Sequence, residues 1–321
     1  MGIRMIEVQH LTKRYDNTVA VNDVSFTILE GQTLVLLGTS GSGKTTTLRM
    51  INRLIEPTAG TVTINGINIL AQPPEELRRS IGYVLQGYGL LPHNTVAENI
   101  AIVPKLLKWD KQKIENRVNE LLHKLQLPAG QYRSVYPSNL SGGQMQRVGL
   151  ARALAANPPI LLMDEPFGAL DPLTKISVRK EFKQLDEIRK KTIVLVTHDV
   201  QEAFELGDTI GLMDKGELVQ LGTPIQLLLN PVNDFVENFF QHQRLQLEWQ
   251  SLFLKDIWND LPDFTSSAPA DLNSNQTGWE AMEMLVNKGR DVSVLDEKTG
   301  KMKKIAFVHL QSAIQKLKQQ A

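Results

Sequence analysis

The stretch LVLLGTSGSGKTTTL, from Leu34 to Leu48, decides the fold of this chain. Four apolar residues lead into a glycine-rich loop, and the loop ends at Lys44 and Thr45, where a run compatible with a helix begins. The pattern GxxxxGK[ST] between a buried strand and a helix is the context of a phosphate-binding P-loop. The sequence therefore predicts a site for a nucleoside triphosphate.

The residues of this loop suit a phosphate group in different ways. Gly38, Gly41 and Gly43 let the backbone take dihedral angles that other residues avoid, so successive N–H groups can form an anion nest. The following helix adds its positive N-terminal end. Lys44 can place a charge on the β- and γ-phosphates, and the Thr45 hydroxyl is the expected ligand of the accompanying Mg²⁺. An ordinary Gly/Ser turn is the alternative, which the flanking strand and helix disfavour.

The composition limits the class of protein. With 321 residues, the chain is long enough for one large domain and a smaller one. Lys plus Arg equals Asp plus Glu at 35 each, which gives no indication of a basic surface for nucleic acid. The absence of cysteine excludes disulfides and thiolate metal sites. No run resembles a signal peptide or reaches the roughly 18 apolar residues of a membrane helix, so we expect a cytosolic protein attached to a membrane through a partner.

The pattern along the chain predicts a nucleotide-binding domain over residues 1–240, with a helical insert at about 88–158. Antiparallel strands should fill residues 3–28, with breaks at Asp16-Asn17 and Asn22-Asp23, and Asn65-Gly66 should turn a hairpin. A Ser/Ala/Asn-rich stretch within residues 241–275 predicts a linker. Residues 276–321 should form a small module of four elements, namely a helix Gly278 to Lys288, strands Asp291 to Leu295 and Lys304 to Val308, and a helix Gln311 to Gln319.

Two further strands end in polar residues that need a chemical reason. The apolar run Ile160 to Met163 ends in Asp164 and Glu165, and the run Thr192 to Thr197 delivers His198. A carboxylate at the C-terminal edge of a strand beside the P-loop strand is placed to hold Mg²⁺, and its neighbour can orient or deprotonate the attacking water. Ligands of parallel sheets bind at this edge, which favours a functional His198 over a packed or surface histidine.

Tyr15 and the stretch LSGGQMQR, from Leu140 to Arg147, carry weaker signals when read alone. The tyrosine lies at a predicted strand break, where it can stack on a flat base or simply lie half-buried at a strand end. The Ser-Gly-Gly start of a helix can offer N–H groups to an anion.

Taken together and in this order, these motifs resemble those of ABC-transporter ATPases over roughly residues 1–240. The resemblance identifies Tyr15 as the adenine-stacking aromatic, Gln86 as the Q-loop residue, Asp171 as the D-loop residue and His198 as the switch histidine. It identifies Asp164 and Glu165 as the Walker B pair. Two loops complete the expected nucleotide site: the Walker A residues Gly38, Thr39, Ser40, Gly41, Ser42, Gly43, Lys44, Thr45 and Thr46, and the signature residues Ser141, Gly142, Gly143 and Gln144.

The resemblance implies an α/β P-loop NTPase core with an antiparallel β-subdomain and a helical subdomain. It also implies a head-to-tail homodimer in which each ATP lies between the Walker A loop of one subunit and the signature of the other. Thr45, Gln86 and Asp164 would surround Mg²⁺, Glu165 would be the general base, and His198 would contact the γ-phosphate. The expected catalytic residues are Glu165, His198, Lys44 and Gln86.

The stretches INRLIEPTAG, LLPHNTVAENIAIVPKLLKW and MDEPFGALDPLTK resemble importers of glycine betaine, choline and related osmoprotectants. Such a subunit would work at the cytoplasmic face of the membrane beneath two integral permease subunits and, indirectly, a substrate-binding protein. An importer of amino acids or another small solute is the alternative, and a soluble ABC protein acting on DNA or ribosomes is disfavoured because no basic track for nucleic acid is visible. The C-terminal module resembles one CBS repeat; such repeats normally pair in tandem, so a regulatory or a purely dimerising role both remain open.

Overall fold

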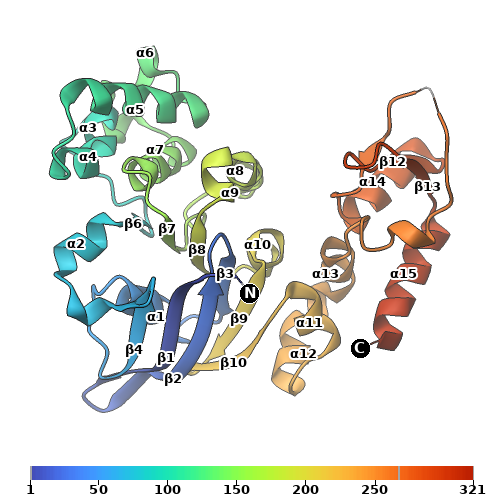
Figure 1. Cartoon of the computed structure of the whole chain (residues 1–321), viewed down its shortest axis with the longest axis horizontal. Coiled ribbons are helices and arrows are strands. Elements are labelled where there is room, and N and C mark those ends of the chain that lie inside the picture. Colours follow the sequence, from blue (N-terminus) through green and yellow to red (C-terminus); the bar gives the residue numbers. More distant parts are fainter. Residues whose placement is uncertain (1, 267, 321) are drawn as a thin grey trace. The chain divides into compact units, whose positions relative to one another are not determined.

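A computed structural model describes residues 2–266 and 268–320 and divides the chain into two compact units, Met1–Leu221 and Gly222–Ala321 (Figure 1). Met1, Ser267 and Ala321, which the sequence predictions include in the first domain, the linker and the last module, lie outside the described residues. Among the described residues, no helix combines the length and the apolar character that crossing a membrane requires.

A four-stranded antiparallel sheet of order β2-β1-β4-β5 opens the first unit. Asn65 and Gly66, both with positive φ (51° and 75°), form the predicted hairpin turn. The predicted break at Asn22-Asp23 is wrong, because the strand continues through it as a bulge in which Asp23 takes a φ of 54°. The strands are β1 (Arg4–Tyr15), β2 (Thr18–Leu29), β4 (Ala59–Ile64) and β5 (Ile67–Asn68).

A six-stranded sheet of order β10-β9-β3-β8-β7-β6 forms the centre of this unit, and β9, β3, β8, β7 and β6 run parallel. Strands β7 and β8 are buried along their whole length, as expected for a parallel sheet covered on both faces. The order places β3 between β8 and β9, so its P-loop lies beside other strand ends. The strands are β3 (Thr33–Gly38), β6 (Ile81–Val84), β7 (Ile160–Asp164), β8 (Thr192–Thr197), β9 (Thr209–Asp214) and β10 (Glu217–Gly222).

Helices flank this sheet and pack apolar side chains against it. The side chain of Leu48 from the P-loop helix joins Leu34 and Leu36 of β3 and Val194 of β8 in one fully buried core. Prolines start two of these helices and Asp199 caps another, which explains where they begin. The helices are α1 (Lys44–Ile51), η1 (Ile69–Ala71), α2 (Pro74–Arg79), α8 (Pro172–Gln184), α9 (Asp186–Arg189) and α10 (Val200–Leu206).

The predicted helical insert is present and gathers beyond the β6 end of the sheet (Figure 1). Capping boxes at Thr95 and Ser141 and a capping Asp110 fix the starts of three of its helices. Val118, Leu121 and Leu122 form the buried stripe that the sequence pattern indicates. Its helices are α3 (Val96–Ile100), α4 (Ile102–Leu106), α5 (Lys111–Lys124), α6 (Ala129–Tyr132), η2 (Pro137–Asn139) and α7 (Gly142–Leu154).

The second unit contains the predicted four-element module, with two corrections. Residues 241–275, which the sequence predicts to be a linker that contains a Gln-rich helix, carry a helix over Arg244–Ser251 but share one buried core with the module through Leu252, Leu254, Ile257, Leu261 and Leu272. The last helix begins at Phe307 and not at Gln311, because β13 already ends at Ile305. Residues 241–275 therefore enlarge the core of the module, which is too small to bury much apolar surface alone.

The three-stranded sheet of the second unit has the order β11-β12-β13, with β11 parallel and β13 antiparallel to β12. Its helices are α11 (Pro224–Leu229), α12 (Asp234–Phe240), η3 (Gln241–Gln243), α13 (Arg244–Ser251), η4 (Trp258–Asp260), α14 (Gly278–Lys288) and α15 (Phe307–Gln320). Its strands are β11 (Leu272–Asn273), β12 (Val292–Leu295) and β13 (Met302–Ile305).

Candidate nucleotide site

The P-loop connects β3 to α1 through glycines that no other residue can replace without strain. Gly43 precedes α1 with a φ of 95°, and a Cβ there would lie 2.5 Å from the carbonyl oxygen of Ala20. At Gly38, a Cβ would lie 2.2 Å from the carbonyl oxygen of Met213 on the neighbouring strand. The loop therefore has its shape because β2 and β9 pack closely against it.

Lys44 is buried and folds back over the loop. Its Nζ donates hydrogen bonds to the carbonyl oxygens of Gly38 and Thr39, at 2.9 and 2.7 Å, and to Ser42 Oγ at 3.2 Å. Burial lowers the pKa of Lys44, while the nearby carboxylates of Glu165 and Asp164 oppose this change. The loop thus concentrates one cation and a set of backbone N–H groups at the start of α1.

Thr45 and Asp164, from two separate elements, meet next to this lysine. The Thr45 hydroxyl donates to Asp164 Oδ1 at 2.8 Å, and Arg49 Nη2 lies 3.9 Å from Oδ2. Burial raises the pKa of Asp164, against the hydrogen bond from Thr45 and the charge of Arg49. Arg49 was absent from the sequence prediction, although its spacing of four residues from Thr45 places both on one face of a helix.

The side chains of Thr45 and Asp164 offer oxygen atoms, the kind of ligand that Mg²⁺ prefers. Among the described residues, no group of three or more His, Cys, Asp or Glu side chains is arranged to hold a metal ion. Mg²⁺ commonly uses one or two carboxylates together with substrate phosphates and water, so the hydroxyl of Thr45 beside the carboxylate of Asp164 fits it. The third predicted ligand, Gln86, lies at the neighbouring carboxylate of Glu165.

Glu165 lies between two of the predicted catalytic side chains. Its Oε2 accepts a hydrogen bond from Gln86 Nε2 at 3.2 Å, and its Oε1 lies 3.2 Å from His198 Nδ1. The backbone takes a φ of 44°, unusual for a residue with a side chain, while its N–H donates to the carbonyl oxygen of Val196 at 2.9 Å. β7 and β8 thus bring the carboxylate and the imidazole together across 33 residues of sequence.

The other predicted residues occupy separate elements. Tyr15, at the end of β1, is 45% exposed, and Lys13 Nζ lies 4.9 Å from its ring centre. Ser141 caps α7 and exchanges hydrogen bonds with Gln144, whose Nε2 also donates to the Tyr132 hydroxyl. Asp171 caps α8 by accepting from the N–H of Thr174 at 3.1 Å. Within the described chain, no hydrogen bond joins residues 141–144 to the P-loop.

A tyrosine that the sequence prediction missed links these outer elements. Tyr88 follows Gln86 by two residues, and its hydroxyl donates to the carbonyl oxygen of Ala169 at 3.2 Å. A Cβ on Gly142 would lie 2.7 Å from the same hydroxyl. The loop after β6 therefore contacts both the start of α7 and the turn before Asp171.

The chain is similar to known proteins of one family. The family model described as ABC transporter matches residues 21–168. The choline transport ATP-binding protein OpuBA of Bacillus subtilis is 52% identical over 88% of this chain and 72% of its own length. A glycine betaine uptake system ATP-binding protein of Escherichia coli, YehX, is 50% identical over 77% of this chain and 80% of its own length.

The chain belongs to the ABC transporter family. It is also 52% identical to the glycine betaine/carnitine/choline transport ATP-binding protein OpuCA of Bacillus subtilis, of which it spans 63%. The dimeric post-hydrolysis structure of the ATP-binding cassette MJ0796 with ADP and Pi matches with a TM-score of 0.62 and 36% identity, over 68% of this chain and 98% of that one. The fold of the first unit is that of an ABC ATPase, a P-loop NTPase with the predicted mixed architecture.

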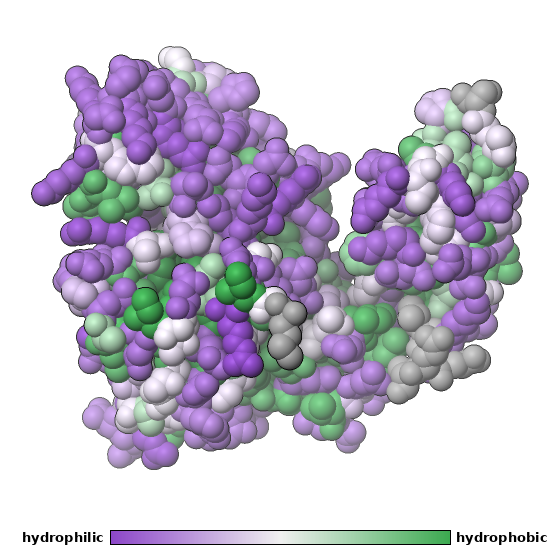
Figure 2. Space-filling view, in the orientation of Figure 1, coloured by the Kyte–Doolittle hydropathy of each residue, from purple (hydrophilic) through white to green (hydrophobic). Residues whose placement is uncertain are grey.

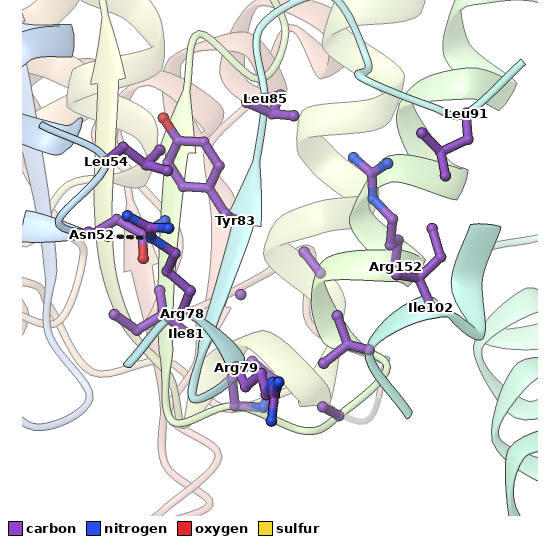
Figure 3. A pocket seen from close by; sticks show the side chains of 15 residues that line it. Asn52, Leu54, Arg78, Arg79, Ile81, Tyr83, Leu85, Leu91, Ile102 and Arg152 are labelled. Atoms are coloured by element: carbon purple, nitrogen blue, oxygen red, sulfur yellow. Dashed lines mark hydrogen bonds between the residues drawn. The ribbon is translucent and has the colours of Figure 1, made fainter. Parts of the chain in front are cut away.

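This ABC ATPase unit also has a groove of about 410 Å³ between β6 and the helical subdomain. Figure 3 shows Asn52, Leu54 and Tyr83 on one side of it, facing Leu91, Ile102 and Arg152 of the helical subdomain. Beside it, Figure 2 shows apolar side chains over α4 within the mostly hydrophilic surface of the helical subdomain, and Leu106 is 54% exposed. Strand β6, which leads to Gln86, therefore forms a wall of this groove.

Proposed function

We propose that this chain is the ATP-hydrolysing subunit of an ABC importer for an osmoprotectant such as glycine betaine, choline, carnitine or a related quaternary amine. The transport functions of its relatives support the substrate class. The observation that supports hydrolysis most directly is the carboxylate of Glu165, which lies 3.2 Å from both Gln86 and His198 and follows the Thr45–Asp164 pair in the chain.

The residues of the site have separate tasks in this proposal. The P-loop N–H groups and Lys44 bind the β- and γ-phosphates, while Thr45, Asp164 and Gln86 would hold Mg²⁺ through their side-chain oxygens. Bound Mg²⁺ would neutralise charge on the β- and γ-phosphate oxygens. Glu165 accepts a proton from the attacking water. The water oxygen forms a bond to the γ-phosphorus while the bond between the γ-phosphorus and the ADP oxygen breaks. His198 holds Glu165 and contacts the γ-phosphate. Positioning and charge neutralisation carry this chemistry.

The complete site requires a second copy of the chain. Ser141 to Gln144 begin a separate helix and have their hydrogen-bonding partners within the helical subdomain. A head-to-tail homodimer places the N-terminus of α7 from one subunit against the ATP held by the P-loop of the other. Tyr15, exposed at the end of β1, is free to stack on the adenine, and Asp171 approaches the partner at the start of α8.

Two integral membrane permease subunits complete the importer, and a substrate-binding protein delivers the solute to them. The groove beside β6 is suited to an apolar segment of a permease, because its walls combine Leu54, Leu85 and Ile102 with three arginine side chains. Since β6 leads directly to Gln86, such a segment would act on the residue that holds Glu165. The chain would work at the cytoplasmic face of the membrane.

The substitution Glu165→Gln tests the catalytic assignment. It keeps the size of the side chain and removes the basic carboxylate, so phosphate release should fall at least about 100-fold, within the range of general-base effects. Nucleotide titration should show ATP still bound, and size-exclusion chromatography with ATP should show a trapped dimer. Normal hydrolysis by this variant would refute the role of Glu165.

The solute requires a separate experiment, since in this proposal the ATPase subunit does not contact it. Deletion of this chain should abolish uptake of radiolabelled choline or glycine betaine, and the intact chain should restore it. Uptake that survives the deletion would reject the osmoprotectant assignment and favour an importer of an amino acid or another small solute.

A further inference from the structure

Lys175 connects the helix after the D-loop to the segment that carries His198. It lies one turn into α8, where its N–H donates to the carbonyl oxygen of Asp171 at 2.9 Å. Its Nζ lies 2.7 Å from Asp199 Oδ2 and 2.7 Å from Glu202 Oε1. These carboxylates belong to the cap and the first turn of α10, directly after His198.

The acidic partners are themselves tied to both sides of His198. The side chain of Glu202 is 1% exposed, and its Oε2 accepts a hydrogen bond from the Thr197 hydroxyl at 2.5 Å. The Thr197 Oγ1 in turn accepts from the N–H of Asp199 at 3.0 Å. The residue before His198 and the residue after it are therefore held in one network that ends at Lys175.

Lys175 supplies the positive charge that faces both carboxylates of this network. Burial opposes the charge of Lys175, but the hydrogen bond to Asp199 and the ion pair with Glu202 outweigh it and raise the pKa of Lys175. Without the lysine, the buried carboxylate of Glu202 would lose its ion-pair partner, and removing one member of a buried pair is the costly way to break it. A hydrophobic contact would join the two helices at a lower cost in desolvation free energy. The ion pairs therefore point to a role beyond stabilising the fold.

A second ion pair joins the same two helices farther from His198. Arg179, one turn beyond Lys175 on α8, places its Nε 3.1 Å from Glu205 Oε2, and its side chain is 11% exposed. This pair resembles that of Lys175 in burial, but Arg179 reaches Asp199 only through its charge and, in the part of the chain that the structure describes, forms no ion pair with it. It therefore offers a matched control for the simple joining of the two helices.

We propose that Lys175 is a positioning residue for His198, which fixes the histidine at Glu165 and transmits the position of the Asp171 turn to it. This inference rests on the proposed role of His198 in hydrolysis. The network lies outside the P-loop, so ATP affinity should depend on it only weakly. A shift of about 1 Å in a catalytic group can cost about 100-fold in rate.

The variants Lys175→Met, Lys175→Arg, Arg179→Met and the double variant Lys175→Met/Glu202→Gln of the full chain test this role. Steady-state phosphate release should show kcat lowered about 10- to 100-fold by Lys175→Met, with KM for ATP changed less than about threefold. Lys175→Arg should recover most of kcat. Arg179→Met should keep kcat within about threefold. The double variant removes the unpaired charge, so its thermal stability should recover while its kcat stays low.

Recovery of kcat together with stability in the double variant, or an equal loss of kcat in Arg179→Met, would reduce Lys175 to a structural residue and overturn the inference. A double-mutant cycle with His198→Ala distinguishes failure of this inference from failure of the proposed function. Lys175→Met should lower kcat less than about threefold in the His198→Ala background. Full additivity would reject the inference alone, whereas normal hydrolysis by His198→Ala would reject the role of His198 and the inference with it.

Discussion

At the scale of single residues, Lys44 and Thr45 are neighbours in sequence with different surroundings. Lys44 is enclosed by carbonyl oxygens of its own loop, whereas the hydroxyl of Thr45 points to Asp164, 119 residues away. The lysine therefore takes its position from local geometry. The threonine takes its partner from the pairing of β3, β8 and β7, and its contact is the one that a metal ion would replace.

The substitution Thr45→Val tests this contact because it retains the shape of the side chain and removes the hydroxyl. Loss of one weak ligand beside a carboxylate should raise the Mg²⁺ concentration for half-maximal hydrolysis about 10- to 100-fold. A fluorescent ATP analogue titrated with and without Mg²⁺ should show the same loss only when Mg²⁺ is present. Thr45→Ser, which keeps the hydroxyl, is the control, and an unchanged Mg²⁺ requirement in Thr45→Val would contradict the assignment.

At the scale of elements, an ion-pair cluster joins the helical subdomain to the core. Arg117 of α5 donates to both carboxylate oxygens of Glu187 on α9 at 3.0 Å and to the carbonyl oxygens of Leu154 and Ala155 at the end of α7. Lys124 adds a second contact to Glu187 at 2.7 Å. The bidentate geometry holds three helices together at one point.

The pH dependence of stability should report this cluster. The hydrogen bond from Arg117 lowers the pKa of Glu187 from 4.5 to about 2, against burial and with help from Lys124. The contribution of Glu187 is therefore complete above about pH 5 and lost as the pH falls through about 2. Glu187→Gln should lower the free energy of unfolding by about 2–3 kcal/mol at pH 7, and the difference should shrink toward pH 2.

Urea unfolding followed by circular dichroism at several pH values measures this difference. The control is Glu120→Gln, since Glu120 contacts the same arginine but is 44% exposed. Its loss should cost less than about 1 kcal/mol, as is usual for exposed pairs. A Glu187→Gln difference that stays constant from pH 7 to pH 2 would show that the ion pairs do not stabilise the cluster.

At the scale of the whole molecule, the chain consists of two units with separate cores. The core of the first unit combines side chains of strands β1 to β4 and β6 to β9, and that of the second combines side chains between Leu252 and Ile314. Every predicted nucleotide and metal residue belongs to the first unit. We propose that the second unit is a CBS-like module that tunes the activity of the importer or pairs with a second copy.

Truncation after Gly222 tests this division. Because the P-loop and its partners are retained, the affinity for a fluorescent ATP analogue should stay within about threefold of the full chain. In cells, uptake by the truncated chain should lose any response to medium osmolarity that the full chain shows. A correctly folded truncation that does not bind ATP would contradict the division, and an unchanged response of uptake would argue against regulation by the second unit.

Much of this molecule follows from the sequence alone. The P-loop between β3 and α1, the hairpin at Asn65-Gly66 and the strands that end at Asp164 and His198 are predictable because each depends on short-range periodicity or turn chemistry. Parallel strands share one carboxyl edge, so the gathering of these residues is predictable as well. The helix–strand–strand–helix order of the last module also follows from its pattern.

Other features were decided only by the tertiary structure. Asn22-Asp23 looks like a break, but pairing with β1 and a hydrogen bond from the N–H of Asn22 to Gly216 keep the strand going. The segment 241–275 has the composition of a linker, yet its leucines fill a core that the small module needs. The contact of Gln86 with Glu165 and that of Lys175 with Glu202 join residues far apart in sequence. A local pattern holds no information on such contacts, because they depend on which elements pack together.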